Sequence, residues 1–142
     1  MGALLLIGRI FFSLIFLSSG INHIVKVKDM TGYAKHKKMP FPGFSVFASG
    51  VLFIAGAVFI ILGVWVDLGA LLIGVTTFLA GVIFHNFWAA DEASKQNEMI
   101  QFMKNISITG AALIIVAVLN IKHGVDFGPS INHGAQILFH KN

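Results

Sequence analysis

The chain has 142 residues, of which 56% are hydrophobic and only 11% are charged. Soluble domains carry about 25% charged residues, so this composition indicates an integral membrane protein and leaves little chain for a separate soluble domain. Because it has no cysteine, the chain cannot itself exchange disulfides, hold an iron–sulfur cluster or offer a thiolate ligand. The net charge of +4 comes from lysines beside apolar runs, which indicates a membrane surface as partner and not nucleic acid.

Four apolar runs, each long enough to cross a bilayer, predict an all-α, polytopic bundle of four transmembrane helices in one domain over residues 1–142. The expected helices cover residues 3–25, 44–64, 68–88 and 104–121. Residues 30–38 are expected to form a short interfacial helix with Tyr33 at headgroup depth. Residues 89–103 either cap the third helix or begin the fourth above the membrane, and residues 122–142 form a surface tail.

Small residues predict where the helices touch. Ser49, Gly56 and Gly63 recur at seven-residue spacing in the second span, and Gly74 and Gly81 mark the third. Transmembrane helices approach closely where side chains are small. We therefore expect these five positions at helix contacts. The short turn at residues 65–67 makes the second and third spans an antiparallel hairpin.

The first span carries a polar stripe. At 100° per residue, one line along the helix holds Arg9, Ser13, Phe16, Gly20 and His23. An ionisable group inside a span must face other protein or a water-filled cavity, so this line should point inward.

The third span repeats the pattern, with Asp67 and His85 18 residues, or five turns, apart. The two spans run in the same direction, which places Arg9 and Asp67 near one membrane face and the two histidines near the other. Arg9 and Asp67 favour a structural role, as an ion pair or as two groups that snorkel separately. We expect Arg9 to bond to Asp67, to backbone carbonyls or to the carboxylate of the tail.

The opposite face of the membrane gathers further polar residues around the two histidines. Imidazoles can bind ligands or move protons near neutral pH. Two interpretations stay open: a pocket for a ligand or a quinone headgroup, and a polar cap that is satisfied internally. The expected ligand-binding residues are His23, His85, Asn86, Trp88, Lys104, Asn22 and Tyr33. The pattern predicts no metal site, and it names no catalytic residue.

Orientation follows from the lysines. The side of the membrane that holds residues 26–43 and 89–103 carries most of them. The positive-inside rule then puts both long connections in the cytoplasm.

The chain resembles the DoxX family of small four-helix membrane proteins over nearly all of its spans. The resemblance rests on GRIFFSLIFLSSGINHI in the first span, on the MPFPG turn, on HNFW after the third span, and on QFMKNISITGAAL entering the fourth. The order H-x-F-W followed about fifteen residues later by F-x-K-N is its most specific part. The family takes its name from subunits of a thiosulfate:quinone oxidoreductase, and other members are associated with redox or thiol stress.

The resemblance implies an accessory or quinone-interacting subunit of a membrane redox system, with Arg9 and His85 as shared anchors. Two departures stand out: His23 where relatives often have lysine, and Leu52 where many have glutamate. The alternatives are a b-type haem electron-transfer protein with His23 and His85 as axial ligands, and a non-enzymatic scaffold or carrier. No single cofactor is assigned: the redox interpretation takes a quinone, the second choice is haem, and the scaffold needs none. The partners considered are the lipid bilayer, a redox subunit and further copies of the chain, in a prokaryotic inner membrane.

Overall fold

The computed structural model describes residues 2–121, 128–129 and 137–138. Most of the expected surface tail therefore lies outside the described residues. Every regular element of the described part is helical: α1 (Gly2–Val25), α2 (Val27–His36), α3 (Pro42–Leu62), α4 (Val66–Phe84), the 3₁₀ turn η1 (Phe87–Ala89) and α5 (Lys95–Leu119). Four of these segments are long and apolar enough to cross a membrane. The all-α class and the four spans are confirmed.

Several boundaries differ from the prediction. Helix α3 begins at Pro42, two residues before the predicted start, because the first helical turn needs no N–H from its leading residue. Helix α4 ends at Phe84, four residues early, so the HNFW segment follows the helix and η1 contains Trp88. Helix α5 begins at Lys95, nine residues early. Of the two alternatives for residues 89–103, the early start of the last helix is therefore the right one.

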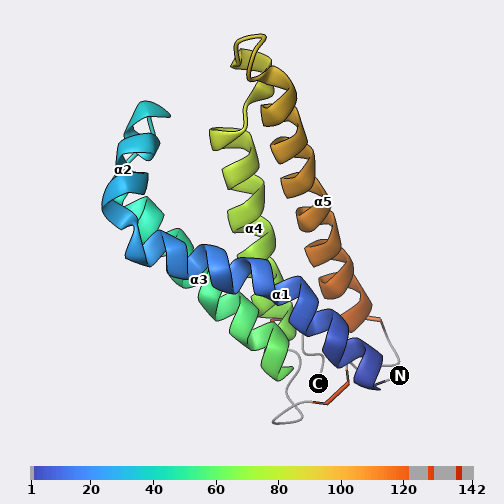
Figure 1. Ribbon diagram of the computed structural model, residues 1–142. Helices are drawn as coiled ribbons and strands as arrows, with labels where there is room; N and C mark the ends of the chain where they lie inside the picture. The colour runs from blue at the N-terminus through green and yellow to red at the C-terminus, as the bar shows by residue number, and fades with distance from the viewer. Residues whose placement is uncertain (1, 122–127, 130–136, 139–142) are drawn as a thin grey trace.

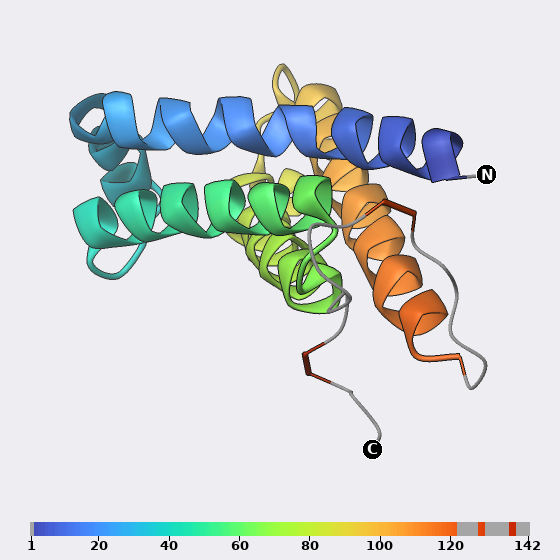
Figure 2. The same ribbon diagram turned by 90° about the horizontal axis from the view of Figure 1, so that it is seen from below.

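The four spans form two antiparallel pairs. Helix α1 packs along α3, and α4 packs along α5, while α3 meets α4 (Figure 1). Seen from below, the α1/α3 pair crosses the α4/α5 pair at a wide angle (Figure 2). Helices α1 and α4 run in the same direction, as predicted, but belong to different pairs.

Glycines set the closest contacts. A Cβ added to Gly56 of α3 would lie 2.8 Å from the Gly69 carbonyl oxygen of α4, and the reverse distance is also 2.8 Å. Gly20 of α1 and Gly50 of α3 make a similar close contact. The backbones thus approach until only hydrogen fits between them.

The predicted small-residue contacts are mostly confirmed. Gly56 meets α4, while Gly74 and Gly81 meet α5, and Ser49 bonds to a side chain of α1. Gly63 is also buried, but it serves as the end of the helix. It lies after the end of α3 with a φ of 72°, a left-handed conformation that glycine adopts without strain.

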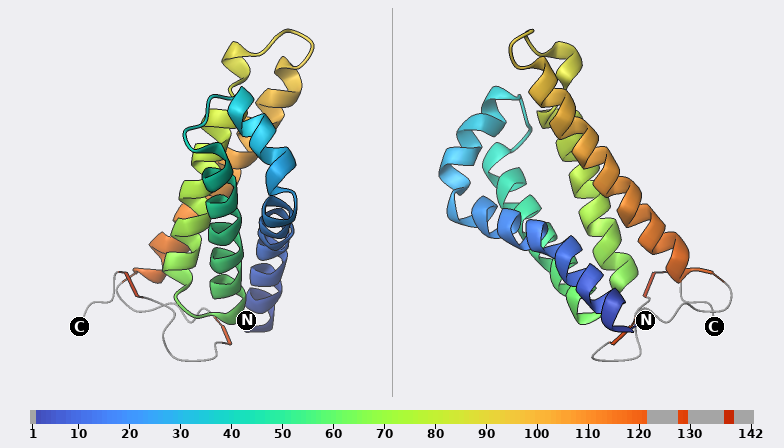
Figure 3. Two further views of the ribbon diagram at one scale, coloured as in Figure 1. Left: turned by 90° about the vertical axis from the view of Figure 1, so that its left-hand side faces the viewer. Right: turned by 45° about the vertical axis from the view of Figure 1, so that its right-hand side comes forward.

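Because α3 and α4 meet at Gly56 and Gly69, close to the short turn that joins them, the two pairs are held together at one end and diverge at the other. Figure 3 shows this divergence toward α2. The residues of α1 that are buried are Arg9, Ser13, Phe16 and Gly20. The inward stripe of the first span is thereby confirmed, and at its α2 end it borders the space between the pairs.

Replacing Gly56 by alanine should destabilise the protein, because the added methyl group meets backbone and not a flexible side-chain end. We expect a loss of about 1–3 kcal/mol in the free energy of unfolding, the usual cost of overpacking. Thermal unfolding in detergent measures it. Gly110→Ala in α5 is the matched control, since a Cβ there meets nothing within 4 Å and should leave stability unchanged or slightly higher. Equal melting temperatures for both variants would contradict the close crossing.

Candidate functional site

A cavity of about 450 Å³ lies between the two helix pairs at the end where they diverge. Its walls come from all four spans and from α2. Phenylalanines and aliphatic side chains form most of the lining, and Leu52, the departure in the second span, is among them. The polar side chains on its wall are Ser19, His23, Tyr33, Ser45, Ser49, Thr76, Thr77, His85, Lys104 and Asn105. An apolar cavity with a few polar groups is the usual form of a small-molecule site.

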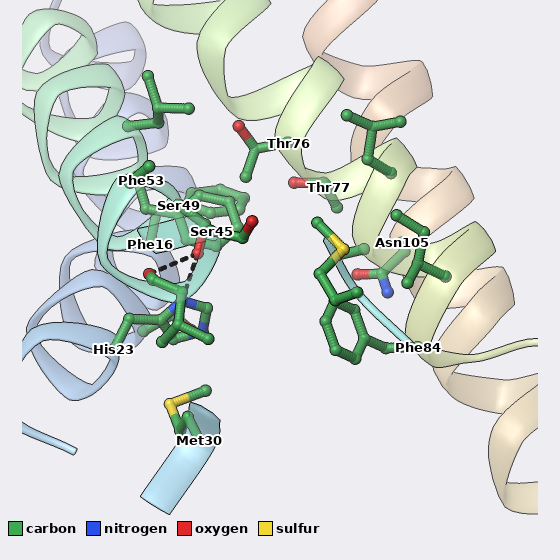
Figure 4. Close-up of a pocket in the computed structure, with 18 of the residues that line it drawn as sticks. Phe16, His23, Met30, Ser45, Ser49, Phe53, Thr76, Thr77, Phe84 and Asn105 are labelled. Atoms are coloured by element: carbon green, nitrogen blue, oxygen red, sulfur yellow. Dashed lines mark hydrogen bonds between the residues drawn. The ribbon is translucent and has the colours of Figure 1, made fainter. Parts of the chain in front are cut away.

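His23 belongs to the α1/α3 wall. Its Nδ1 lies 2.8 Å from the hydroxyl of Ser49, and that hydroxyl donates to the Val46 carbonyl oxygen at 2.8 Å. The imidazole also meets the Phe53 ring edge-on, with centroids 5.7 Å apart. These contacts fix the ring orientation and occupy Nδ1 (Figure 4). The remaining nitrogen, Nε2, is the one that a ligand would use.

His85 stands on the other side of the cavity, where it is the residue directly after α4. Its Nδ1 lies 2.9 Å from Glu98 Oε2 of α5. Both side chains are partly buried, with 26% and 19% of their surfaces exposed. A carboxylate can only accept from this nitrogen, so Nδ1 carries a proton and Nε2 is again the free position.

Helix α2 joins the two pairs across the interfacial end of the cavity. The Tyr33 ring stacks on Phe84 with centroids 5.8 Å apart. Lys37 Nζ donates to Asn86 Oδ1 at 3.1 Å. Burial raises the pKa of the Tyr33 phenol, and the nearby Glu98 charge raises it further.

Four of the seven ligand-binding candidates line the cavity: His23, His85, Tyr33 and Lys104. The other three, all described residues, do not. Asn22 is exposed near the start of α2. Asn86 accepts a hydrogen bond from Lys37. Trp88 is 56% exposed and packs on Phe102. For Asn86 and Trp88, closeness in sequence to His85 was misleading because α4 ends before them, so helical phase no longer governs where they point. Asn22 lies on α1 directly before His23, and one residue along a helix turns the side chain by about 100°.

Arg9 lies at the end of the bundle where the two helix pairs are held together, which we call the closed end. It is only 5% exposed. Its Nη2 donates to the carbonyl oxygens of Ile61 at 2.8 Å and Pro129 at 2.7 Å. Carbonyls were one of its three predicted partners. Ile61 is in the last turn of α3, where carbonyls lack partners within the helix and a positive charge is favourable.

Asp67 is fully buried in the first turn of α4. It accepts the backbone N–H groups of Leu68, Ile137 and Leu138 at 2.8–3.1 Å. A carboxylate is favourable at this end of a helix. Neither Asp67 nor Arg9 snorkels to the surface, so that alternative is wrong. Both are buried, and each holds a part of the C-terminal segment.

Sequence reasoning missed Thr77, which lines the cavity and is 2% exposed. A signal was present. Ile73, Gly74, Thr77 and Gly81 share one buried face of α4, so the stripe of small residues continues through Thr77. Asn105 of α5 is 8% exposed and lies on the same wall of the cavity, nearer to Phe84 (Figure 4).

Comparison with known proteins agrees with this architecture. Residues 4–86 match the DoxX family model, a stretch that runs from α1 to the residues after α4. The chain belongs to the DoxX family. It is 31% identical over 112 residues to the inner membrane protein YphA of Escherichia coli strain K12, an alignment that covers 79% of this chain and 80% of that protein. No solved structure matches the chain.

The DoxX match includes Arg9, His23, Asp67 and His85 but ends before α5. The family assignment therefore covers both histidines and the two buried charges. The Glu98 partner of His85 and the Asn105 wall of the cavity lie beyond it.

Replacing Arg9 by leucine should lower stability, because it leaves the Ile61 and Pro129 carbonyls without this donor. Hydrogen bonds to charged groups contribute about 1.5–3 kcal/mol each. We expect a loss of at least about 1.5 kcal/mol in the free energy of unfolding, measured by thermal melting in detergent. Unchanged melting would show that Arg9 contributes little to the closed end.

The chain has a single tyrosine, so phenolate absorbance reports Tyr33 alone. The titration midpoint should lie above the ordinary tyrosine value, since burial and Glu98 both disfavour the anion. Glu98→Gln should lower the midpoint only in part, because burial, the larger cause, remains. Glu92→Gln, at an exposed glutamate, is the control and should leave the midpoint in place. A midpoint that ignores both substitutions would place Glu98 away from Tyr33.

Proposed function

We propose that the cavity binds the headgroup of a membrane quinone and that the protein is an accessory subunit of a quinone-linked redox system. The observation that carries the proposal is the fixed imidazole of His23 on the cavity wall. Its Nδ1 is occupied by Ser49, which leaves Nε2 for a ligand oxygen. Such orienting polar groups give a largely apolar site its specificity.

The size and lining of the cavity suit a flat ring. Its volume of about 450 Å³ falls within the ~300–1,000 Å³ typical of small-molecule sites. Phe16, Phe53 and Phe84 line it, and aromatic side chains pack well against a planar headgroup.

The cavity also reaches the lipid-facing surface. Phe44 is 73% exposed and Leu79 is 48% exposed, yet both line the cavity. A hydrophobic chain attached to the headgroup could therefore pass between the helix pairs into the bilayer. This favours a lipid-soluble ligand over a water-soluble one.

The proposal needs a partner. Side chains of this protein cannot carry electrons by themselves, so electrons must pass between the bound quinone and a redox subunit. We also propose that the protein lies in a prokaryotic inner membrane, and that α2 and the connection before α5 face the cytoplasm because they carry most of the lysines.

Haem is the second candidate, and one observation favours it. Both histidines use Nδ1 within the protein and keep Nε2 free, the arrangement that metal-ligating histidines commonly show. A scaffold, in which the polar stripe only fixes helix packing, is the third. The absorption spectrum of the purified protein separates haem from the others, because bis-histidine haem gives a Soret band.

The quinone proposal is tested by titrating decylubiquinone, in its oxidised form and in its reduced form kept without oxygen, into the protein in lipid nanodiscs, with binding followed by calorimetry. His23→Ala and His85→Ala should each weaken binding of the form that the wild type binds more tightly by about tenfold, the effect of one lost hydrogen bond of ~1.4 kcal/mol. Ser107→Ala in α5, an exposed position, is the control and should bind like the wild type. Equal affinities for all four proteins, or no binding to any, would refute the site and favour the scaffold.

A further inference from the structure

The hydroxyl group of Thr77 is buried on the wall of the cavity. The residue is 2% exposed, and its Oγ1 makes no hydrogen bond within the described part of the chain. Helical threonines commonly bond back to the carbonyl four residues earlier, and Thr109 of α5 does so, to Asn105 at 2.9 Å. An unpaired buried hydroxyl is costly. Figure 4 shows this hydroxyl directed into the cavity.

Asn105 extends the same wall. Its side chain lies against Gly81 of α4, where a Cβ would meet it at 3.1 Å, and it lines the cavity beside Thr77. Thr77 thus supplies an O–H donor, and Asn105 supplies both an amide donor and a carbonyl acceptor. This wall faces the α1/α3 wall that carries His23 (Figure 4).

The hydrogen bonds of Ser49 determine which form His23 takes. Ser49 has one hydroxyl hydrogen, and it is donated to the Val46 carbonyl. Its oxygen must therefore accept from His23 Nδ1–H. No carboxylate bonds to His23 among the described residues, and an uncompensated charge is expensive at this depth. The ring is then neutral, and its Nε2 is an acceptor only.

We propose that the cavity selects the reduced, dihydroxy form of the ring, with Thr77 as its second anchor. One ligand hydroxyl donates to His23 Nε2, and the oxygen at the opposite end of the ring accepts from Thr77 and meets the Asn105 amide. An oxidised quinone has two acceptors and no donor, so it would set a carbonyl oxygen against the Nε2 lone pair. This inference rests on the proposed function, because it assumes that a quinone-type ring enters the cavity.

The test compares decylubiquinol with decylubiquinone on the full-length protein in nanodiscs, without oxygen so that the quinol stays reduced. We expect the quinol to bind about tenfold more tightly, the value of one hydrogen bond. Thr77→Val should weaken quinol binding about tenfold, while the melting temperature of the free protein stays the same or rises, because an unsatisfied hydroxyl is removed. Thr77→Ser, which keeps the hydroxyl, should restore binding.

Thr109→Val makes the same chemical change on the same helix pair, at a hydroxyl bonded to backbone. It should lower the melting temperature and leave quinol affinity unchanged. Tighter binding of the quinone, or equal binding of both forms, would overturn the selection of the reduced ring while the proposed function stands. Unchanged quinol affinity in Thr77→Val would overturn the role of Thr77. Binding of neither form would overturn the proposed function itself.

Discussion

The close approach of Gly56 and Gly69 determines the shape of the whole molecule. At this point each glycine faces the other's carbonyl oxygen, so α3 and α4 cross backbone to backbone near the turn that joins them. In a bilayer, helices associate through such packing because burial from water gives no further gain. Two rigid antiparallel pairs joined tightly at one end must diverge at the other. The cavity is the consequence of that divergence, and α2 covers its interfacial end.

Two buried charges stabilise the closed end: one lies at the C-terminal end of α3 and the other at the N-terminal end of α4. Arg9 binds the last turn of α3, and Asp67 lies in the first turn of α4, on either side of the same connection. Each charge meets the helix end of opposite sign. Because both also bond to backbone groups near the C-terminus, they can stay within the bundle without pairing to each other. The polar groups of this end therefore have a structural explanation.

At the open end, several polar groups are only partly satisfied. His23 and His85 each keep one nitrogen free, and the Thr77 hydroxyl has no partner within the described residues. Buried polar groups are normally paired, so an unpaired group on the wall of a cavity calls for an explanation such as a functional role. Membership of the DoxX family and similarity to an inner membrane protein locate the chain in a membrane. The chemistry of this cavity is what distinguishes a ligand site from a scaffold.

The sequence by itself determined the four spans, the inward stripe of α1 and most glycine contacts, because hydropathy and helical phase are local properties of the chain. It also placed His23 and His85 at one end. It wrongly placed Asn86 and Trp88 in the cavity lining, because no local sequence signal indicated that α4 ends at Phe84. Tertiary packing alone decided that α1 and α4 belong to separate pairs and that Ser49 fixes the His23 ring. It also decided that Thr77 lies on the opposite wall with no partner among the described residues. Those facts depend on the crossing of α3 and α4, and a crossing angle is a property of two surfaces in contact, which no single helix encodes.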